Sequence, residues 1–169
     1  AGDCDALTEA VRAMDEENGD AIGSTTNFMI ILAALTGVLH RYSRQEDIVI
    51  GTGVAGRQHP DLQNVIGMFI NSLALRNQPL PQLTLRDFIR NVKETCLNAF
   101  QNQDVQFESL VETINPHRDP SRSPLFDVSL FVQNFSPSSK TMENISYSPY
   151  GKVPNIVKND IEIQVIENE

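Results

Sequence analysis

Apolar residues recur at helical spacing in two segments, and a third segment is apolar on almost every side. In residues 85–100 they fall three and four positions apart, which predicts an amphipathic helix capped by Thr84. Residues 3–17 show the same spacing of apolar residues together with a solvated acidic face, so we expect an amphipathic helix there too. Residues 25–42 are almost wholly apolar, so we expect a buried helix that begins at Thr25 or the next threonine.

Short runs of β-branched and aromatic residues predict the strands. Residues 47–51 are typical of an interior strand, and residues 66–76 of a longer one. We expect further strands at 126–135, 145–150 and 160–166, and a short helix at 107–114. Because strands and helices interleave, the pattern favours an α/β domain with a mixed β-sheet covered by helices. The sequence stops just after a good strand, so we expect a fragment of a longer polypeptide.

Composition and charge narrow the classes of function. The 169 residues suit one domain, and with 40% apolar and 21% charged residues they are not a disordered chain. The net charge of −9 argues against a nucleic-acid groove and against an anionic membrane surface. The longest apolar run, Phe28–Leu35, is too short to span a bilayer, and no secretory signal is visible. We therefore expect a cytoplasmic protein.

Candidate catalytic chemistry is sparse. Gly51–Gly56 spells G-x-G-x-x-G, but Pro60 follows without an apolar helical stripe, so we expect a flexible strand exit rather than a dinucleotide site. Two cysteines and three histidines are isolated, which leaves no zinc spacing and no triad-like arrangement. The sequence therefore predicts no metal site, and we expect the histidines at the surface or at helix ends.

Polar residues interrupt apolar segments in three places. Asn71 lies within the expected strand 66–76, residues 102–104 follow the long helix, and residues 118–122 precede another apolar run. A buried amide or ion pair is costly unless its polar groups are paired. Such residues either brace loops through hydrogen bonds or line a cavity, and both alternatives stay open.

These three places match a known set of motifs. Residues 66–76, IGMFINSLALR, are similar to I-G-x-F-V-N-T-L-x-x-R, and residues 102–108, NQDVQFE, to (H/N)-Q-D-x-P-F-E. Residues 118–126, RDPSRSPLF, are similar to R-D-x-S-R-x-P-L-F. Residues 39–51 resemble the segment L-x-R-Y-S-G-Q-E-D-I-V-V-G of the same proteins. Together the segments resemble the condensation domains of nonribosomal peptide synthetases, over about residues 5–167.

The resemblance implies a chloramphenicol-acetyltransferase-like fold, in which two α/β lobes form a V around a tunnel. Residues 1–169 would be the C-terminal lobe, truncated. Ser72 and Gln106 stand where the family commonly has threonine and proline, which affects only local loop geometry. The motif residues would form tunnel wall and scaffold. They are Gly67, Phe69, Asn71, Arg76, Asn102, Gln103, Asp104, Phe107, Glu108, Arg118, Asp119, Ser121, Arg122, Pro124, Leu125 and Phe126.

For Arg122 we expect a structural brace. A guanidinium offers a rigid fork of donors, and Arg122 would bind loop carbonyls or a carboxylate such as Asp104 or Asp119. A contact to substrate or carrier is the other possibility for this side chain.

The family reaction implied by the resemblance is amide formation by an acyltransferase. The two thioester substrates are carried on phosphopantetheine arms of peptidyl carrier domains, and no cofactor is bound directly. The sequence lacks the family's catalytic H-H-x-x-x-D-G, so we assign no catalytic residue and expect the isolated chain to be inactive. The pattern at 68–71 favours ordinary peptide-bond formation over cyclisation or epimerisation.

The resemblance also implies partners. These are the N-terminal lobe of the same domain, peptidyl carrier proteins and the adjacent adenylation domain. We also expect self-association through the lobe face that lacks its partner. The alternative function is a noncatalytic module of the same fold that binds a carrier or another partner protein through its half of the tunnel.

Overall fold

The computed structural model describes residue 9, residues 25–114, 117, 119, 121–133 and 158–166. The helix expected at 3–17 and the strand expected at 145–150 lie outside this part of the chain, apart from the single residue Glu9. Among the described residues, no helix combines the length and the apolar character needed to cross a membrane.

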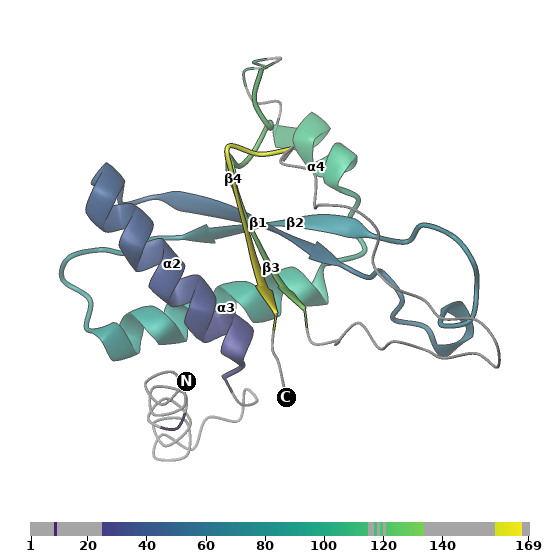
Figure 1. Ribbon diagram of the computed structural model, residues 1–169, viewed down its shortest axis with the longest axis horizontal. Coiled ribbons are helices and arrows are strands. Elements are labelled where there is room, and N and C mark those ends of the chain that lie inside the picture. The colour runs from purple at the N-terminus through teal and green to yellow at the C-terminus, as the bar shows by residue number, and fades with distance from the viewer. Residues whose placement is uncertain are drawn as a thin grey trace, which may run out of the picture.

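Four strands form one mixed sheet in the order β2-β1-β3-β4 (Figure 1). They are β1 (Ile48–Val54), β2 (Asn71–Asn77), β3 (Val128–Gln133) and β4 (Ile161–Ile166). β1 pairs antiparallel with β2 along its whole length, whereas β3 runs parallel to both β1 and β4. The expected mixed sheet is confirmed, and β1 is the interior strand that the sequence predicts at 47–51.

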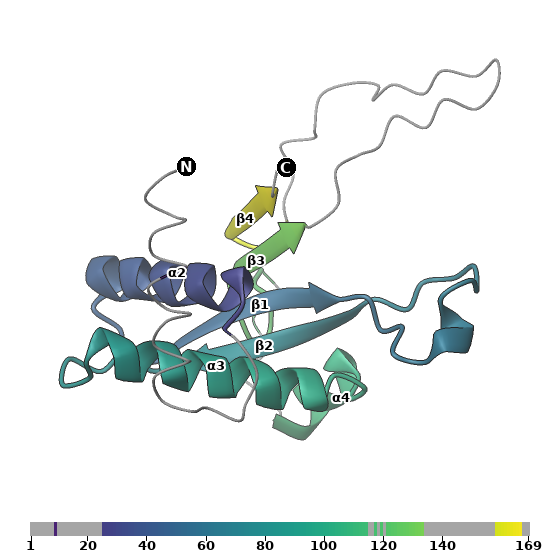
Figure 2. The same cartoon turned by 90° about the horizontal axis from the view of Figure 1, so that it is seen from below.

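Two long helices, α2 (Asn27–Ser43) and α3 (Leu85–Gln101), lie side by side against the sheet (Figures 1 and 2). Each begins at a threonine that satisfies a backbone N–H of the first turn. Thr26 Oγ1 accepts from the Met29 N–H at 3.4 Å, and Thr84 Oγ1 accepts from the Asp87 N–H at 3.2 Å. The sequence predicts Thr25 or Thr26 as the cap of α2, and the structure uses Thr26.

The core lies between this helical pair and the sheet. One face of α3 is buried there, which confirms the apolar stripe read from the sequence. The buried residues of α2 run from Met29 to Thr36, and Tyr42 in its last turn is exposed, so the expectation of a buried helix is wrong for that end. The most deeply buried side chains include Leu32, Ile50, Leu75, Val92, Cys96 and Leu130.

Gly51 and Gly53 lie within β1, which corrects the expectation of a loop there. A Cβ atom on Gly51 would come within 2.1 Å of the Phe126 ring, and one on Gly53 within 3.1 Å of the Phe131 ring. Both rings therefore occupy space that a side chain on β1 would fill. The glycine motif serves aromatic packing. The next helix is the short 3-10 helix η1 (Pro60–Leu62), so no helix opens at Gly56 to face a pyrophosphate.

The expected strand at 66–76 is only partly correct. β2 begins at Asn71, and residues 66–70 before it lie outside the sheet. The short helix α4 (Phe107–Ile114) matches its prediction. β3 begins at Val128 rather than at the expected 126, and residues 134 and 135, where the expected strand ends, lie outside the described part of the chain.

Candidate functional site

A cleft of about 330 Å³ lies where β2 begins, between the β1–β2 connection and the segment that joins α3 to α4. Two of the three motif segments meet here although they are separated in sequence. The lining residues are Gly56, Met68, Phe69, Ile70, Asn71, Ser72, Gln103, Asp104, Gln106, Phe107 and Glu108.

Asn71 connects the two motifs at the floor of this cleft. Its side-chain nitrogen donates to the carbonyl oxygens of Gln103 at 2.8 Å and Val105 at 2.7 Å. Its side-chain oxygen accepts from the Phe107 N–H at 3.2 Å and from the Ser72 N–H at 2.9 Å. Both donors and both acceptor sites of a buried amide are thus used, so this side chain fixes the path of residues 103–107.

The first residues of that path end helix α3. Asn102 Nδ2 donates to the Asn98 carbonyl and Gln103 Nε2 to the Phe100 carbonyl, each at 2.8 Å. The Asn98 carbonyl also accepts from the Asn102 N–H at 3.2 Å and the Phe100 carbonyl from the Gln103 N–H at 3.4 Å, so each side-chain amide adds a second hydrogen bond at the end of the helix. Both side chains of the motif therefore brace the turn rather than point into the cleft as free groups.

Two acidic residues stand at the rim. Asp104 is exposed and accepts from Gln58 Nε2 at 3.4 Å, while Glu108 is exposed in the first turn of α4. Of the described residues that line the cleft, these two are the only ionisable ones. Within the described residues no group of three or more His, Cys, Asp and Glu is placed to hold a metal ion. The described lining of the cleft is made of amides, apolar groups and these two carboxylates, and no histidine is among these residues.

The third motif reaches the cleft through one aromatic contact. The Phe126 ring lies 5.6 Å from the Phe107 ring, centroid to centroid, and rests on β1 at Gly51. This contact ties α4 to the sheet. Pro124 is exposed and Leu125 half-buried, and neither lines the cleft.

Arg122 pairs with Asp127, at the start of β3, through both its Nε and a terminal nitrogen, with Nε 3.1 Å from the carboxylate. This bidentate pair corrects the partners that the sequence suggested, Asp104 and Asp119. Asp119 instead accepts from the Ser121 hydroxyl at 2.7 Å and backbone N–H at 2.9 Å, which lowers the pKa of its carboxyl. Arg118 lies outside the described residues.

Arg76 is the motif residue farthest from the cleft along β2. Its Nε and a terminal nitrogen donate to the two carboxylate oxygens of Asp47 at 2.8 and 2.6 Å. These bonds hold the pKa of Asp47 below its ordinary value. Since Arg76 does not line the cleft, the structure places it in a different part of the surface.

Sequence reasoning missed Arg57 and the special role of Gly56. The Arg57 guanidinium donates to the carbonyls of Leu62, Val65 (2.8 Å) and Gly67 (3.0 Å) and lies 4.4 Å from the centroid of the Phe69 ring. One cation thereby shapes the whole connection between β1 and β2. The only signal in the sequence was a single arginine in a loop whose other charged residue is Asp61.

Gly56 allows the turn that brings Phe69 back. Its φ of +63° suits glycine, and a Cβ atom would stand 1.9 Å from the Phe69 carbonyl oxygen. With the chain held in this way, Ile66, Met68 and Ile70 are 101%, 89% and 69% exposed. We call these three residues the apolar ladder. It alternates along the chain beside the cleft and explains why residues 66–70 resemble a strand in sequence.

Comparison with known proteins gives a consistent result. The family model described as "Condensation domain" matches residues 6–169. The chain is 42% identical to gramicidin S synthase 2 of Brevibacillus brevis over 164 residues, and 40% identical to bacitracin synthase 3 of Bacillus licheniformis over 163. Each match covers 96% of this chain, but only 4% and 2% of those long relatives.

Solved structures agree in fold. A four-domain nonribosomal peptide synthetase crystallised with AMP and glycine matches with a TM-score of 0.64 and 32% identity, over 66% of this chain and 8% of that one. The X-domain from teicoplanin biosynthesis matches with a TM-score of 0.75 and 24% identity, over 96% of this chain and 36% of that one.

Proposed function

Since the chain belongs to the condensation-domain family of nonribosomal peptide synthetases, we propose that it forms one lobe of an amide-forming acyltransferase. The cleft at the start of β2 is part of the wall along which two carrier-bound thioesters meet. The amine of one aminoacyl group attacks the thioester carbon of the other. A carbon–nitrogen bond forms and the carbon–sulfur bond breaks. The proton that the amine loses is transferred to the departing sulfur, which leaves as a free thiol.

The base for this proton transfer belongs to the partner lobe in our proposal. The sequence contains no adjacent pair of histidines, and the cleft is lined by amides, apolar groups and two carboxylates. The contribution of this lobe is positioning. Holding two tethered reactants in one passage removes much of the entropic cost of their encounter.

The apolar ladder is the observation that carries the proposal. Large apolar side chains so fully exposed beside a cleft are typical of a surface that another protein covers. The hydrogen bonds of Arg57 hold the ladder in place, so it is presented on a shaped loop. We assign the ladder to the contact with the N-terminal lobe of the same domain.

The experiment combines this chain with a separately produced N-terminal lobe from the same open reading frame. Donor and acceptor amino acids are loaded onto their carrier proteins, and the dipeptidyl thioester is followed by mass spectrometry. We expect product only when both lobes are present. Ile66→Asp/Met68→Asp should abolish product by weakening lobe association, whereas Tyr42→Asp, at an equally exposed site on α2, should leave it unchanged.

Turnover by this chain alone, near the rate of a complete domain, would contradict the proposal. A chain that binds a carrier protein but never supports product with its partner lobe would favour the noncatalytic module instead. The ladder also predicts self-association of the isolated chain at high concentration. Sedimentation velocity of the parent and of the double aspartate variant tests this, and a strictly monomeric parent would count against it.

A further inference from the structure

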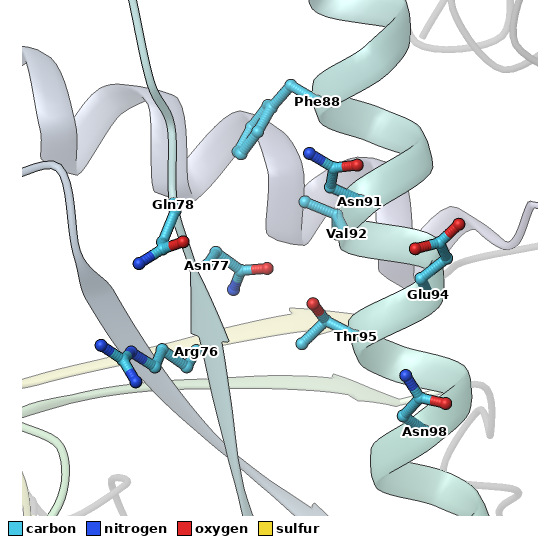
Figure 3. A pocket seen from close by; sticks show the side chains of 9 residues that line it. All are labelled: Arg76, Asn77, Gln78, Phe88, Asn91, Val92, Glu94, Thr95 and Asn98. Atoms are coloured by element: carbon cyan, nitrogen blue, oxygen red, sulfur yellow. The ribbon is translucent and has the colours of Figure 1, made fainter. Parts of the chain in front are cut away.

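A second pocket, of about 320 Å³, lies at the other end of β2, between that strand and α3 (Figure 3). It shares no lining residue with the cleft at Asn71. Phe88 and Val92 form an apolar patch of its wall, and most of the remaining lining is uncharged and polar. A volume of this size accommodates a small group or a short stretch of peptide.

The polar residue that draws attention is Asn77. It continues the inward-facing series of β2 after Leu73 and Leu75, where an apolar side chain is expected, and it is only 3% exposed. Its Nδ2 donates to the Leu75 carbonyl oxygen at 3.1 Å, which fixes the orientation of the amide. The buried Oδ1 has no hydrogen-bond partner in the structure.

That oxygen faces the helix. In Figure 3, Asn77 and Thr95 point toward each other across the pocket, one from β2 and one from α3. A buried carbonyl oxygen without a donor is unfavourable, so the geometry asks for a guest that carries an N–H or O–H group. The free acceptor is therefore directed at whatever occupies the pocket.

Three uncharged polar side chains lie in a row on the wall formed by α3. Asn91, Thr95 and Asn98 occupy positions i, i+4 and i+7, which lie on one face of a helix. They span roughly 10 Å, the length of about three residues of extended chain. Amide and hydroxyl side chains both donate and accept, which suits a ligand that alternates N–H and C=O groups.

The charges around the pocket disfavour other ligands. An anion would meet the unpaired Asn77 oxygen and the Glu94 carboxylate, while the positive charge of Arg76 is already engaged by Asp47. Among the described residues no cluster of metal-ligating side chains exists. The kind of ligand that remains is an uncharged group that both donates and accepts hydrogen bonds.

We propose that this pocket binds an amide group of an extended peptide segment, with the amide N–H donating to Asn77 Oδ1 and the planar group resting against Phe88. The amide belongs either to the backbone or to an asparagine or glutamine side chain of the peptide. This site is separate from the cleft and does not depend on the function proposed above.

The test is an NMR titration of the uniformly ¹⁵N-labelled chain. The probes are acetyl-Ala-Ala-Ala-N-methylamide, which offers backbone amides alone, and the same peptide with glutamine in the centre. We expect saturable shifts at the Asn77 side-chain amide and along residues 91–98. Equal affinities of the two probes assign the backbone amide, and a tighter glutamine peptide assigns the carboxamide.

Asn77→Leu removes the acceptor and should weaken binding at least tenfold. Thr95→Phe fills the pocket from the opposite wall and should do the same if the first variant does not fold. Asn64→Leu, at an exposed asparagine far along the β1–β2 connection, is the matched control and should bind like the parent. Shifts that grow linearly without saturation, equal shifts in Asn77→Leu, or equally tight binding of glycerol would each overturn the proposal.

Discussion

Both ends of β2 carry an asparagine on the same face of the strand, but the two side chains differ in their hydrogen bonding. Asn71, the first residue of the strand, and Asn77, the last, both point to the buried side. Asn71 has all its hydrogen-bonding capacity used, three bonds by residues 103–107 and one by the neighbouring Ser72 N–H, whereas the oxygen of Asn77 has no partner. A buried amide that is fully paired joins segments together, and one that is half-paired leaves an unmet requirement.

The largest expected effect is at the paired end. Asn71→Ala leaves two carbonyl oxygens and the Phe107 N–H without their partner and opens a small void, which should cost about 3–5 kcal/mol of folding stability. Urea unfolding followed by circular dichroism measures this. A loss below about 1 kcal/mol would mean that water replaces the amide at no great cost and that the contrast between the two ends is false.

Gly56 provides the second test, since it shapes the loop that leads into Asn71. Gly56→Ala places a Cβ atom against the Phe69 carbonyl at a positive φ, and should cost about 2–3 kcal/mol. Gly37→Ala is the matched control, because nothing lies within 4 Å of its new Cβ atom. Inside helix α2 this control should gain about 0.5–1 kcal/mol, and an equal loss in both variants would refute the argument.

At Asn77, the half-paired end of β2, the expected change in folding stability has the opposite sign. In the absence of ligand, Asn77→Leu removes a buried oxygen without a partner and continues the apolar series of β2, so stability should stay within about 1 kcal/mol of the parent or rise. The same urea experiment measures it. A loss as large as that of Asn71→Ala would show that the two asparagines are equivalent.

The smallest effect concerns Asp47 and Arg76, next to Asn77. Since the folded pKa of Asp47 lies below the ordinary value of 3.8, its contribution to stability is present above that pH and is lost as the pH falls through the folded pKa. Asp47→Asn should lower the melting temperature at pH 7 by about 3 °C or less. The difference from the parent should vanish once the pH has fallen below the folded pKa of Asp47, which itself lies below 3.8, and a difference independent of pH would contradict the assignment.

The sequence predicts the helices of residues 25–114 well because each signal is local. The stripe of α3 and the threonines before both long helices depend on residues within a few positions of one another. Residues 66–70 mislead because they alternate as a strand does, yet Arg57 holds them through contacts that only the folded loop creates. Alternation of apolar and polar residues indicates which side chains lie on the same side of an extended segment. It does not indicate whether a neighbouring strand pairs with that segment.

The same limit applies to the site. Asn71 is visible as a polar residue in an apolar frame, but three of its four hydrogen-bond partners lie more than 30 positions away and no spacing rule connects them. Arg122 is visible as a rigid fork of donors, but the sequence suggests the wrong carboxylates for it, because Asp127 lies just before β3, a strand whose position is set by the sheet. Asn77 was overlooked, since a polar residue at a strand end attracts no notice until the fold buries it.

The narrow junction inside the sheet has a consequence for the order in which the protein assembles. Seven residue pairs join β1 to β2 and six join β3 to β4, but only two join β1 to β3, reinforced by the hydroxyl of Thr52 on the Leu130 carbonyl. The first pairing closes a short loop, whereas the junction must close a loop of more than 70 residues. We expect the β1–β2 hairpin to form early and the β3–β4 pair to dock last. In native-state hydrogen exchange, backbone amides at this junction should open at lower free energy than those between β1 and β2, and equal protection would exclude this sequence of events.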